Sequence, residues 1–105
     1  MKHNKLVRDK IPDIIRENGE TPVVRTLNAI EFKRELKRKL HEEVGEVLGA
    51  KTKREFVDEL ADVHDVLRAL YAAYGLSPTD ITKAAGEKRK KRGWFAKKIF
   101  LIETN

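Results

Sequence analysis

The chain has 105 residues, of which 40% are hydrophobic and 38% are charged. This composition suits one compact domain covering residues 1–105 and carries too many charges for a membrane protein. The absence of cysteine excludes disulfide scaffolds, cysteine-ligated zinc sites and thiol catalysis. No apolar run reaches the roughly 20 residues of a membrane span, and the first residues lack the apolar stretch of a signal peptide, so we expect a cytoplasmic protein.

The first elements predicted along the chain are a short helix and a short strand. Asp9 to Asn18 favour a helix, with Asp9 as its N-cap and Pro12 in its first turn. The β-branched residues of Thr21 to Leu27 indicate a strand, and the similar run Ile99 to Ile102 is its candidate partner. We therefore expect a small two-stranded sheet that joins the ends of the chain.

Three further helices are predicted between these strands. Apolar residues recur at spacings of mostly three and four over positions 28–50, with Asn28 as the N-cap, and again over positions 56–74. Ser77-Pro78-Thr79-Asp80 starts a third helix that runs to about Arg92. The short link between the two long helices predicts that they are antiparallel neighbours.

Charge is unevenly distributed along the chain. The net charge is +6, but positions 83–98 hold eight basic residues and one acidic residue, whereas positions 42–65 hold eight acidic and three basic residues. A basic segment alone would suggest nucleic acid or another polyanion as partner, yet an acidic region of this density repels nucleic acid. The two opposite clusters therefore require a different explanation.

Some of the acidic residues fall on the apolar faces of the two long helices. On a helical projection of about 100° per residue, Glu43 falls inside the apolar arc of the first helix and Glu46 falls on its edge. In the second helix, Glu59 falls among the apolar residues and Asp62 borders them. Two neighbouring helices therefore direct four carboxylates toward one region.

Grouped carboxylates that are shielded from water stay ionised only when a positive charge joins them. A divalent cation meets this need, and ligands that offer oxygen atoms alone favour Mg²⁺ or Mn²⁺ over Zn²⁺. Such a cation, with Lys and Arg side chains closing from the other side, is the arrangement of charge that phosphoryl-transfer and phosphoanhydride chemistry requires. The residues alone therefore predict a hard cation and a phosphate-bearing substrate.

The same residues resemble the signature of a known superfamily. Glu42-Glu43-Val44-Gly45-Glu46, followed after twelve residues by Glu59-Leu60-Ala61-Asp62, is similar to the EExxE and ExxD motifs of the all-α nucleoside triphosphate pyrophosphohydrolases, typified by MazG. Two further stretches resemble the small branch labelled phosphoribosyl-ATP pyrophosphohydrolase-like. They are Lys5 to Pro12 near the N-terminus and, near the C-terminus, Lys88-Arg89, Arg92-Gly93, Phe95 and Lys97-Lys98-Ile99.

The resemblance implies a fold, a reaction and an assembly. The expected fold is a mainly α, MazG-like helical bundle completed by dimerisation, as a homodimer or a dimer of dimers. The implied reaction is hydrolysis of a nucleotide between its α- and β-phosphates, giving monophosphate and pyrophosphate. Mg²⁺ would be held by Glu43, Glu46, Glu59 and Asp62. We assign Glu42 as a second-metal ligand or as the group that orients or deprotonates the attacking water.

Basic residues are expected to bind the substrate phosphates. A triphosphate brings about four negative charges to the site, and one or two divalent cations leave part of that charge uncompensated. The basic segment near the C-terminus offers the first candidates, and the N-terminal motif offers the next. They are Lys88, Arg89, Arg92 and Lys97, followed by Lys5, Arg8 and Lys10.

Three functions are compatible with these observations. The first is a Mg²⁺-dependent hydrolase that removes non-standard or surplus nucleoside triphosphates. The second is hydrolysis of phosphoribosyl-ATP in histidine synthesis, which uses the same bond cleavage and metal. The third is a non-enzymatic helical module that binds nucleic acid through Lys83 to Lys98, but it leaves Glu43 and Glu59 unexplained. We therefore expect a nucleotide rather than nucleic acid as the partner.

Overall fold

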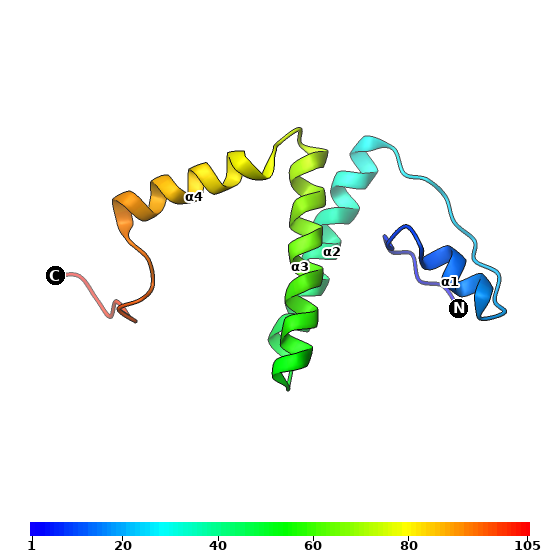
Figure 1. Cartoon of the computed structure of the whole chain (residues 1–105), viewed down its shortest axis with the longest axis horizontal. Coiled ribbons are helices and arrows are strands. Elements are labelled where there is room, and N and C mark those ends of the chain that lie inside the picture. Colours follow the sequence, from blue (N-terminus) through cyan, green and yellow to red (C-terminus); the bar gives the residue numbers. More distant parts are fainter. The chain divides into compact units, whose positions relative to one another are not determined.

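The computed structural model describes residues 1–105 and consists of four helices without a β-strand. In chain order the helices are α1 (Ile11–Glu17), α2 (Ala29–Gly49), α3 (Lys53–Ala73) and α4 (Pro78–Arg92) (Figure 1). The mainly α fold class is therefore confirmed. The chain forms two compact units, Met1–Gly75 and Leu76–Asn105. The interpretation of the whole chain as one domain stays a prediction.

The centre of the first unit is a hairpin of the two long helices. α2 and α3 pack against each other across the short link Ala50–Thr52, as the sequence predicted. The best buried apolar side chains of the chain are Leu36 on α2 and Val66 on α3, at 2% and 9% exposure. Burial of such side chains contributes about 1.5–3 kcal/mol each. The packing of α2 on α3 thus determines which residues of the two helices face each other.

Much of the apolar surface of this hairpin stays exposed. Val44, Phe56 and Leu60 are exposed by 41%, 44% and 43%, although all three belong to the apolar pattern that predicted the two long helices. The reason is geometric, because two packed helices cover only one side of each other and leave the rest of a broad apolar arc open. None of the four helices has the length and apolar character needed to cross a membrane.

Side-chain caps define where three of the helices begin. The Asn28 side chain accepts a hydrogen bond from the Glu31 N–H at the start of α2, and the Glu31 carboxylate accepts one from the Asn28 N–H. Ser77 and Asp80 form the same reciprocal pair at α4. The predicted starts at Asn28 and Ser77 are therefore confirmed. Asp9 is not the N-cap of α1, because that helix begins one residue later, after Lys10, without a side-chain cap.

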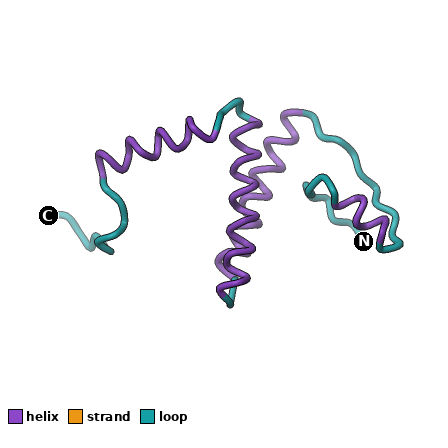
Figure 2. The backbone as a smooth tube through the Cα atoms, in the orientation of Figure 1, coloured by secondary structure: helices purple, strands orange, loops and turns teal.

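The predicted two-stranded sheet is wrong. Both segments, Thr21 to Leu27 and Ile99 to Ile102, have extended or irregular backbone, and neither forms the inter-strand hydrogen bonds of a ladder (Figure 2). The two segments belong to different compact units. β-Branched residues favour strands because their side chains pack well on a half-buried sheet, which requires a neighbouring strand. Without a paired strand, the valines at 23 and 24 remain exposed.

A pH-dependent contribution to stability is expected at the start of α2. Arg25 and then the Asn28 N–H lower the pKa of Glu31 to about 2. A carboxyl with a lowered folded-state pKa adds stability above its unfolded pKa of about 4.5 and loses it as the pH falls toward 2. We expect Glu31→Gln to be less stable than wild type at pH 6. Urea unfolding should show the two proteins converging between pH 4.5 and 2, and a constant difference would contradict the assignment.

Candidate metal centre

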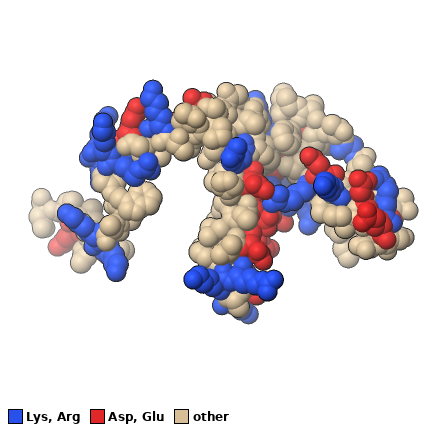
Figure 3. All heavy atoms as spheres, viewed as in Figure 1, with Lys and Arg blue, Asp and Glu red and all other residues tan.

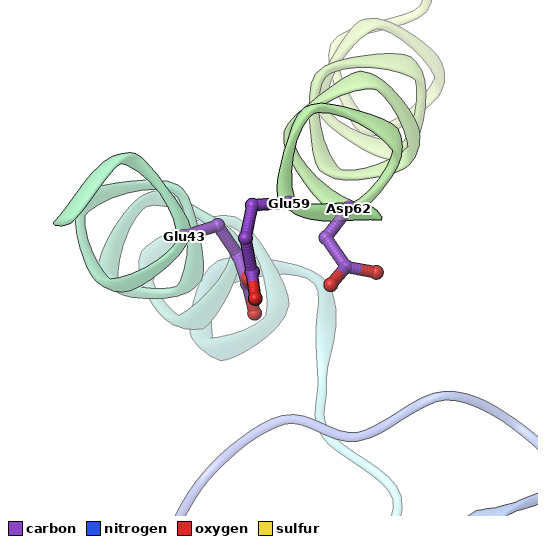
Figure 4. A group of neighbouring side chains, drawn as sticks. All are labelled: Glu43, Glu59 and Asp62. Carbon is purple, nitrogen blue, oxygen red and sulfur yellow. The ribbon is translucent and has the colours of Figure 1, made fainter. Parts of the chain in front are cut away.

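Three carboxylates meet across the helix hairpin. Glu43 projects from α2, and Glu59 and Asp62 project from α3, so that one carboxylate oxygen of each lies within 4.8 Å of the others (Figure 4). Glu43 is only 8% exposed, in agreement with its predicted place inside the apolar face. The structure therefore brings together three of the four carboxylates predicted to hold a metal.

The other two acidic residues of the EExxE motif lie outside this group. Glu42 and Glu46 are both exposed. Glu46 shares a side of the helix with Glu43 but falls on the edge of the apolar arc, and Glu42 is rotated about 100° from Glu43. Glu46 still lies close enough for its negative charge to act on Glu59. The roles predicted for Glu42 and Glu46 stay predictions.

Mutual repulsion is visible in the ionisation of Glu59. Partial burial raises the pKa of this carboxyl, and the negative charges of Glu46, Asp62, Glu43 and Asp58 raise that pKa further. The shift means that the ionised cluster is unfavourable in the absence of added positive charge. A cation placed among these oxygens would offset both the cost of burying the Glu59 charge and its repulsion by the neighbouring carboxylates.

A lysine side chain pairs with the buried carboxylate of Glu43. The Lys39 Nζ lies 3.5 Å from Glu43 Oε1, one helical turn away on α2, and both side chains are largely shielded, at 19% and 10% exposure. A paired charge is what allows a glutamate to be buried at this position. Sequence reasoning missed Lys39, although the i, i+4 spacing to Glu43 is the signal that could have found it.

An arginine side chain of the N-terminal segment contacts the carboxylate cluster. Arg8 Nη2 donates to Asp62 Oδ1 at 2.7 Å, and Arg8 Nη1 donates to Asp65 Oδ2 at 2.7 Å. Arg8 in turn lowers the pKa of Asp65. Of the three N-terminal basic residues singled out in the sequence, Arg8 forms ion pairs with these aspartates, whereas Lys5 and Lys10 form none. Asp65 was not predicted, although it follows Asp62 by one turn of α3.

The basic residues near the C-terminus lie on and after α4 in the second unit. Lys88, Arg89 and Arg92 are exposed in the last turns of that helix, and Lys97 follows it; Lys and Arg side chains gather there in Figure 3. Lys88 and Arg92 line a shallow surface hollow of about 260 Å³. The Arg89 guanidinium lies 5.7 Å from the centre of the Trp94 ring, a cation–π contact. The predicted contacts of these residues with phosphates stay predictions.

Comparison with known proteins identifies the family. Residues 7–89 match the family model described as phosphoribosyl-ATP pyrophosphohydrolase. The chain belongs to this family. The match confirms the resemblance to the MazG-like all-α pyrophosphohydrolases, and it covers Arg8 and all three clustered carboxylates.

A further comparison finds a relative of unknown activity. An uncharacterised protein of Mycolicibacterium smegmatis (strain ATCC 700084 / mc(2)155) is 51% identical over 49 residues, which are 47% of this chain and 50% of the relative. The chain therefore spans about half the length of that curated relative. No solved structure matches the chain.

The carboxylate cluster fits the cation that phosphoribosyl-ATP pyrophosphohydrolases typically use, Mg²⁺. Glu43, Glu59 and Asp62 offer oxygen atoms alone, close together and on two packed helices. Mg²⁺ prefers oxygen ligands and usually takes a few carboxylates while it keeps several waters. The repulsion that raises the Glu59 pKa is the kind of strain that such an ion removes.

Proposed function

We propose that the protein is a Mg²⁺-dependent pyrophosphohydrolase that converts a nucleoside triphosphate to monophosphate and pyrophosphate. The observation that carries the proposal is the cluster of Glu43, Glu59 and Asp62 in a chain of the phosphoribosyl-ATP pyrophosphohydrolase family. An acidic cluster alone is common on protein surfaces. Its coincidence with the motif residues of a family that cleaves phosphoanhydrides makes hydrolysis the function best supported. Removal of non-standard or surplus nucleotides in the cytoplasm is the role we assign to it.

The residues of the cluster are assigned as the cation's ligands. Glu43, Glu59 and Asp62 would hold Mg²⁺, with Glu46 as the fourth member of the set. When bound, the cation supplies electrostatic stabilisation to the negative charge of the phosphates. The packing of α2 on α3 would hold the carboxylates in place before the substrate arrives, so that little reorganisation is needed during the reaction.

The remaining steps are assigned to other side chains of this chain. Glu42 precedes the buried Glu43 and is exposed, so its carboxylate is free to accept a proton from the attacking water. Arg8 and the basic residues Lys88, Arg89, Arg92 and Lys97 neutralise the phosphates, and the leaving pyrophosphate gains most from this charge.

A second substrate is supported by the family description itself. The model that matches residues 7–89 is named for phosphoribosyl-ATP, whose hydrolysis breaks the same kind of bond. The carboxylate cluster would serve both reactions, since both break a bond between the α- and β-phosphates. Assaying both kinds of nucleotide would therefore distinguish the two substrates.

A second copy of the chain is proposed to complete the fold. The hairpin leaves Val44, Phe56 and Leu60 partly exposed, and apolar residues on the open faces of both helices would be covered by the same faces of another hairpin. The proposed assembly is a homodimer or a dimer of dimers, in the form of a MazG-like bundle over residues 1–105.

The decisive experiment identifies the bond that is broken. With Mg²⁺ present, standard and non-standard nucleoside triphosphates and phosphoribosyl-ATP are incubated with the protein, and the products are separated by chromatography. We expect monophosphate and pyrophosphate in equal amounts from at least one of them. Glu43→Gln, purified in the same way, should be inactive and excludes a contaminating phosphatase.

Two results would contradict this assignment. Diphosphate and orthophosphate as products would mean that a different linkage is attacked. No turnover of any nucleotide, combined with nucleic-acid binding that weakens steeply with salt, would favour the non-enzymatic module instead.

A further inference from the structure

Arg8 is held by two carboxylates on the same face of α3. Its two terminal nitrogens donate to Asp62 Oδ1 and Asp65 Oδ2, each at 2.7 Å. Asp62 and Asp65 are one helical turn apart, so their side chains are neighbours on the helix surface. Two contacts fix both the position and the plane of a guanidinium, whereas a single contact leaves it free to rotate. The arrangement therefore orients Arg8 as well as pairing its charge.

The two aspartates have different relations to the candidate metal centre. Asp62 belongs to the group with Glu43 and Glu59, and Asp65 does not. The side chains of Arg8, Asp62 and Asp65 are 57%, 39% and 55% exposed, and ion pairs as exposed as these contribute little to stability. The main effect of Asp65 is thus to hold the Arg8 guanidinium beside the carboxylate cluster.

Arg8 retains unused capacity for an anion. Its bonds to the aspartates occupy one N–H of each terminal nitrogen, and the remaining N–H donors belong to a side chain that is more than half exposed. Planar guanidinium donors match the geometry of phosphate oxygens. A polyphosphate entering a site lined by carboxylates requires positive charge close to those carboxylates.

We propose that Asp65 is a positioning residue, which holds the Arg8 guanidinium beside Asp62 so that its remaining N–H donors bind the phosphates of the substrate. The inference rests on the proposed function and deepens it, because it names the residue that orients the phosphate-binding arginine. Asp65 itself contacts neither the cation nor the substrate.

The test compares Asp65→Asn with the matched control Asp58→Asn. Asp58 lies on the same helix, is exposed, and makes no contact with Arg8, so its replacement changes charge equally. Binding of inorganic pyrophosphate in saturating Mg²⁺, and of Mn²⁺ alone, is measured by calorimetry, together with KM and kcat for the best nucleotide.

We expect Asp65→Asn to weaken pyrophosphate binding and to raise KM about tenfold, the loss expected for a misplaced charge-assisted hydrogen bond. Its affinity for Mn²⁺, its kcat and its melting temperature should stay close to those of Asp58→Asn. Asp65→Glu should recover most of the pyrophosphate affinity, since a carboxylate is restored.

A double-mutant cycle with Arg8→Gln shows whether Asp65 acts through Arg8. Arg8→Gln should weaken pyrophosphate binding by at least as much, and adding Asp65→Asn to it should have little further effect. The proposal would be overturned if Asp65→Asn weakened pyrophosphate binding equally in the wild type and in Arg8→Gln. It would also be overturned if Arg8→Gln bound Mn²⁺ more tightly without losing affinity for pyrophosphate. If Asp65→Asn weakens pyrophosphate binding only when Arg8 is present but no nucleotide is hydrolysed, the proposed function alone is refuted. If a nucleotide is hydrolysed but Asp65→Asn weakens pyrophosphate binding equally with and without Arg8, the role of Asp65 alone is refuted.

Discussion

Replacing Glu59 with glutamine is expected to abolish the thermal stabilisation that Mg²⁺ or Mn²⁺ gives to the wild-type protein. Glu59 is one of three carboxylates whose oxygens lie within 4.8 Å of one another. A cation that binds only the folded state at about ten times its Kd adds about 1.4 kcal/mol. For a domain of this size, that gain raises Tm by about 6–11 °C. The neutral amide is a poor ligand, so the variant should show no comparable rise.

The same substitution is expected to stabilise the protein when no metal is present. Burial and neighbouring carboxylates raise the pKa of Glu59. A carboxyl whose folded-state pKa is raised contributes stability below its unfolded pKa and loses that contribution as the pH rises through the folded value. The wild type therefore becomes less stable, relative to a variant that cannot ionise at this position, as the pH rises. Glu59→Gln cannot ionise, so in EDTA its Tm should exceed that of wild type at pH 7, and the difference should shrink toward pH 4.

Asp58→Asn is the control for the metal response. Because the Asp58 charge also raises the Glu59 pKa, Asp58→Asn should stabilise the protein in EDTA as well, but by less than Glu59→Gln. It removes one negative charge from the same helix, but Asp58 is exposed and lies outside the carboxylate group. Its Mg²⁺ response should match that of wild type. Differential scanning calorimetry or fluorimetry with EDTA, Mg²⁺ and Mn²⁺ measures all of these values. A wild-type Tm that ignores Mg²⁺, with and without a nucleotide analogue, would count decisively against the metal centre.

The second large effect is expected at the C-terminal end of α4. Arg92→Ala and Lys88→Ala should each lower kcat/KM about tenfold or more, which corresponds to the loss of a charge-assisted hydrogen bond worth about 1.5–3 kcal/mol. The two residues are one helical turn apart and line the same surface hollow. A contact made equally in ground and transition states would appear in KM. A contact to charge that develops on the leaving pyrophosphate would appear in kcat.

Lys90→Ala is the matched control for these two variants. Lys90 lies in the same last turns of α4 but does not line the hollow. Its loss changes the net charge and the interaction with the helix dipole by similar amounts. Metal-dependent stabilisation should survive in all three variants. Wild-type kinetics in both Arg92→Ala and Lys88→Ala would show that the segment is only a solvated helix face.

Local signals in the sequence were sufficient for the helices and for the core of the candidate metal centre. The cap at Asn28 and the capping box at Ser77 are read from a few adjacent residues, and such interactions require no knowledge of the rest of the fold. The short link between the long helices set them side by side. Helical periodicity then placed Glu43 and Glu59 near each other, as the structure shows.

Features that depend on distant partners were predicted wrongly or not at all. Thr21 to Leu27 has the composition of a strand but no strand beside it, and pairing is a property of two segments rather than one. The contact of Arg8 with Asp62 and Asp65 joins parts of the chain more than fifty residues apart. No periodicity links such positions, so the role of Asp65 emerged only from the structure.

The short link Ala50–Thr52 has a consequence for how the candidate metal centre forms during folding. The entropic cost of closing a loop grows with its length, and contacts between residues close in sequence form fastest. Glu43 lies shortly before this link, and Glu59 and Asp62 lie shortly after it. The cluster is therefore a structure of low contact order. Its carboxylates meet as soon as the two helices collapse onto each other, before the N-terminal segment has to be in place.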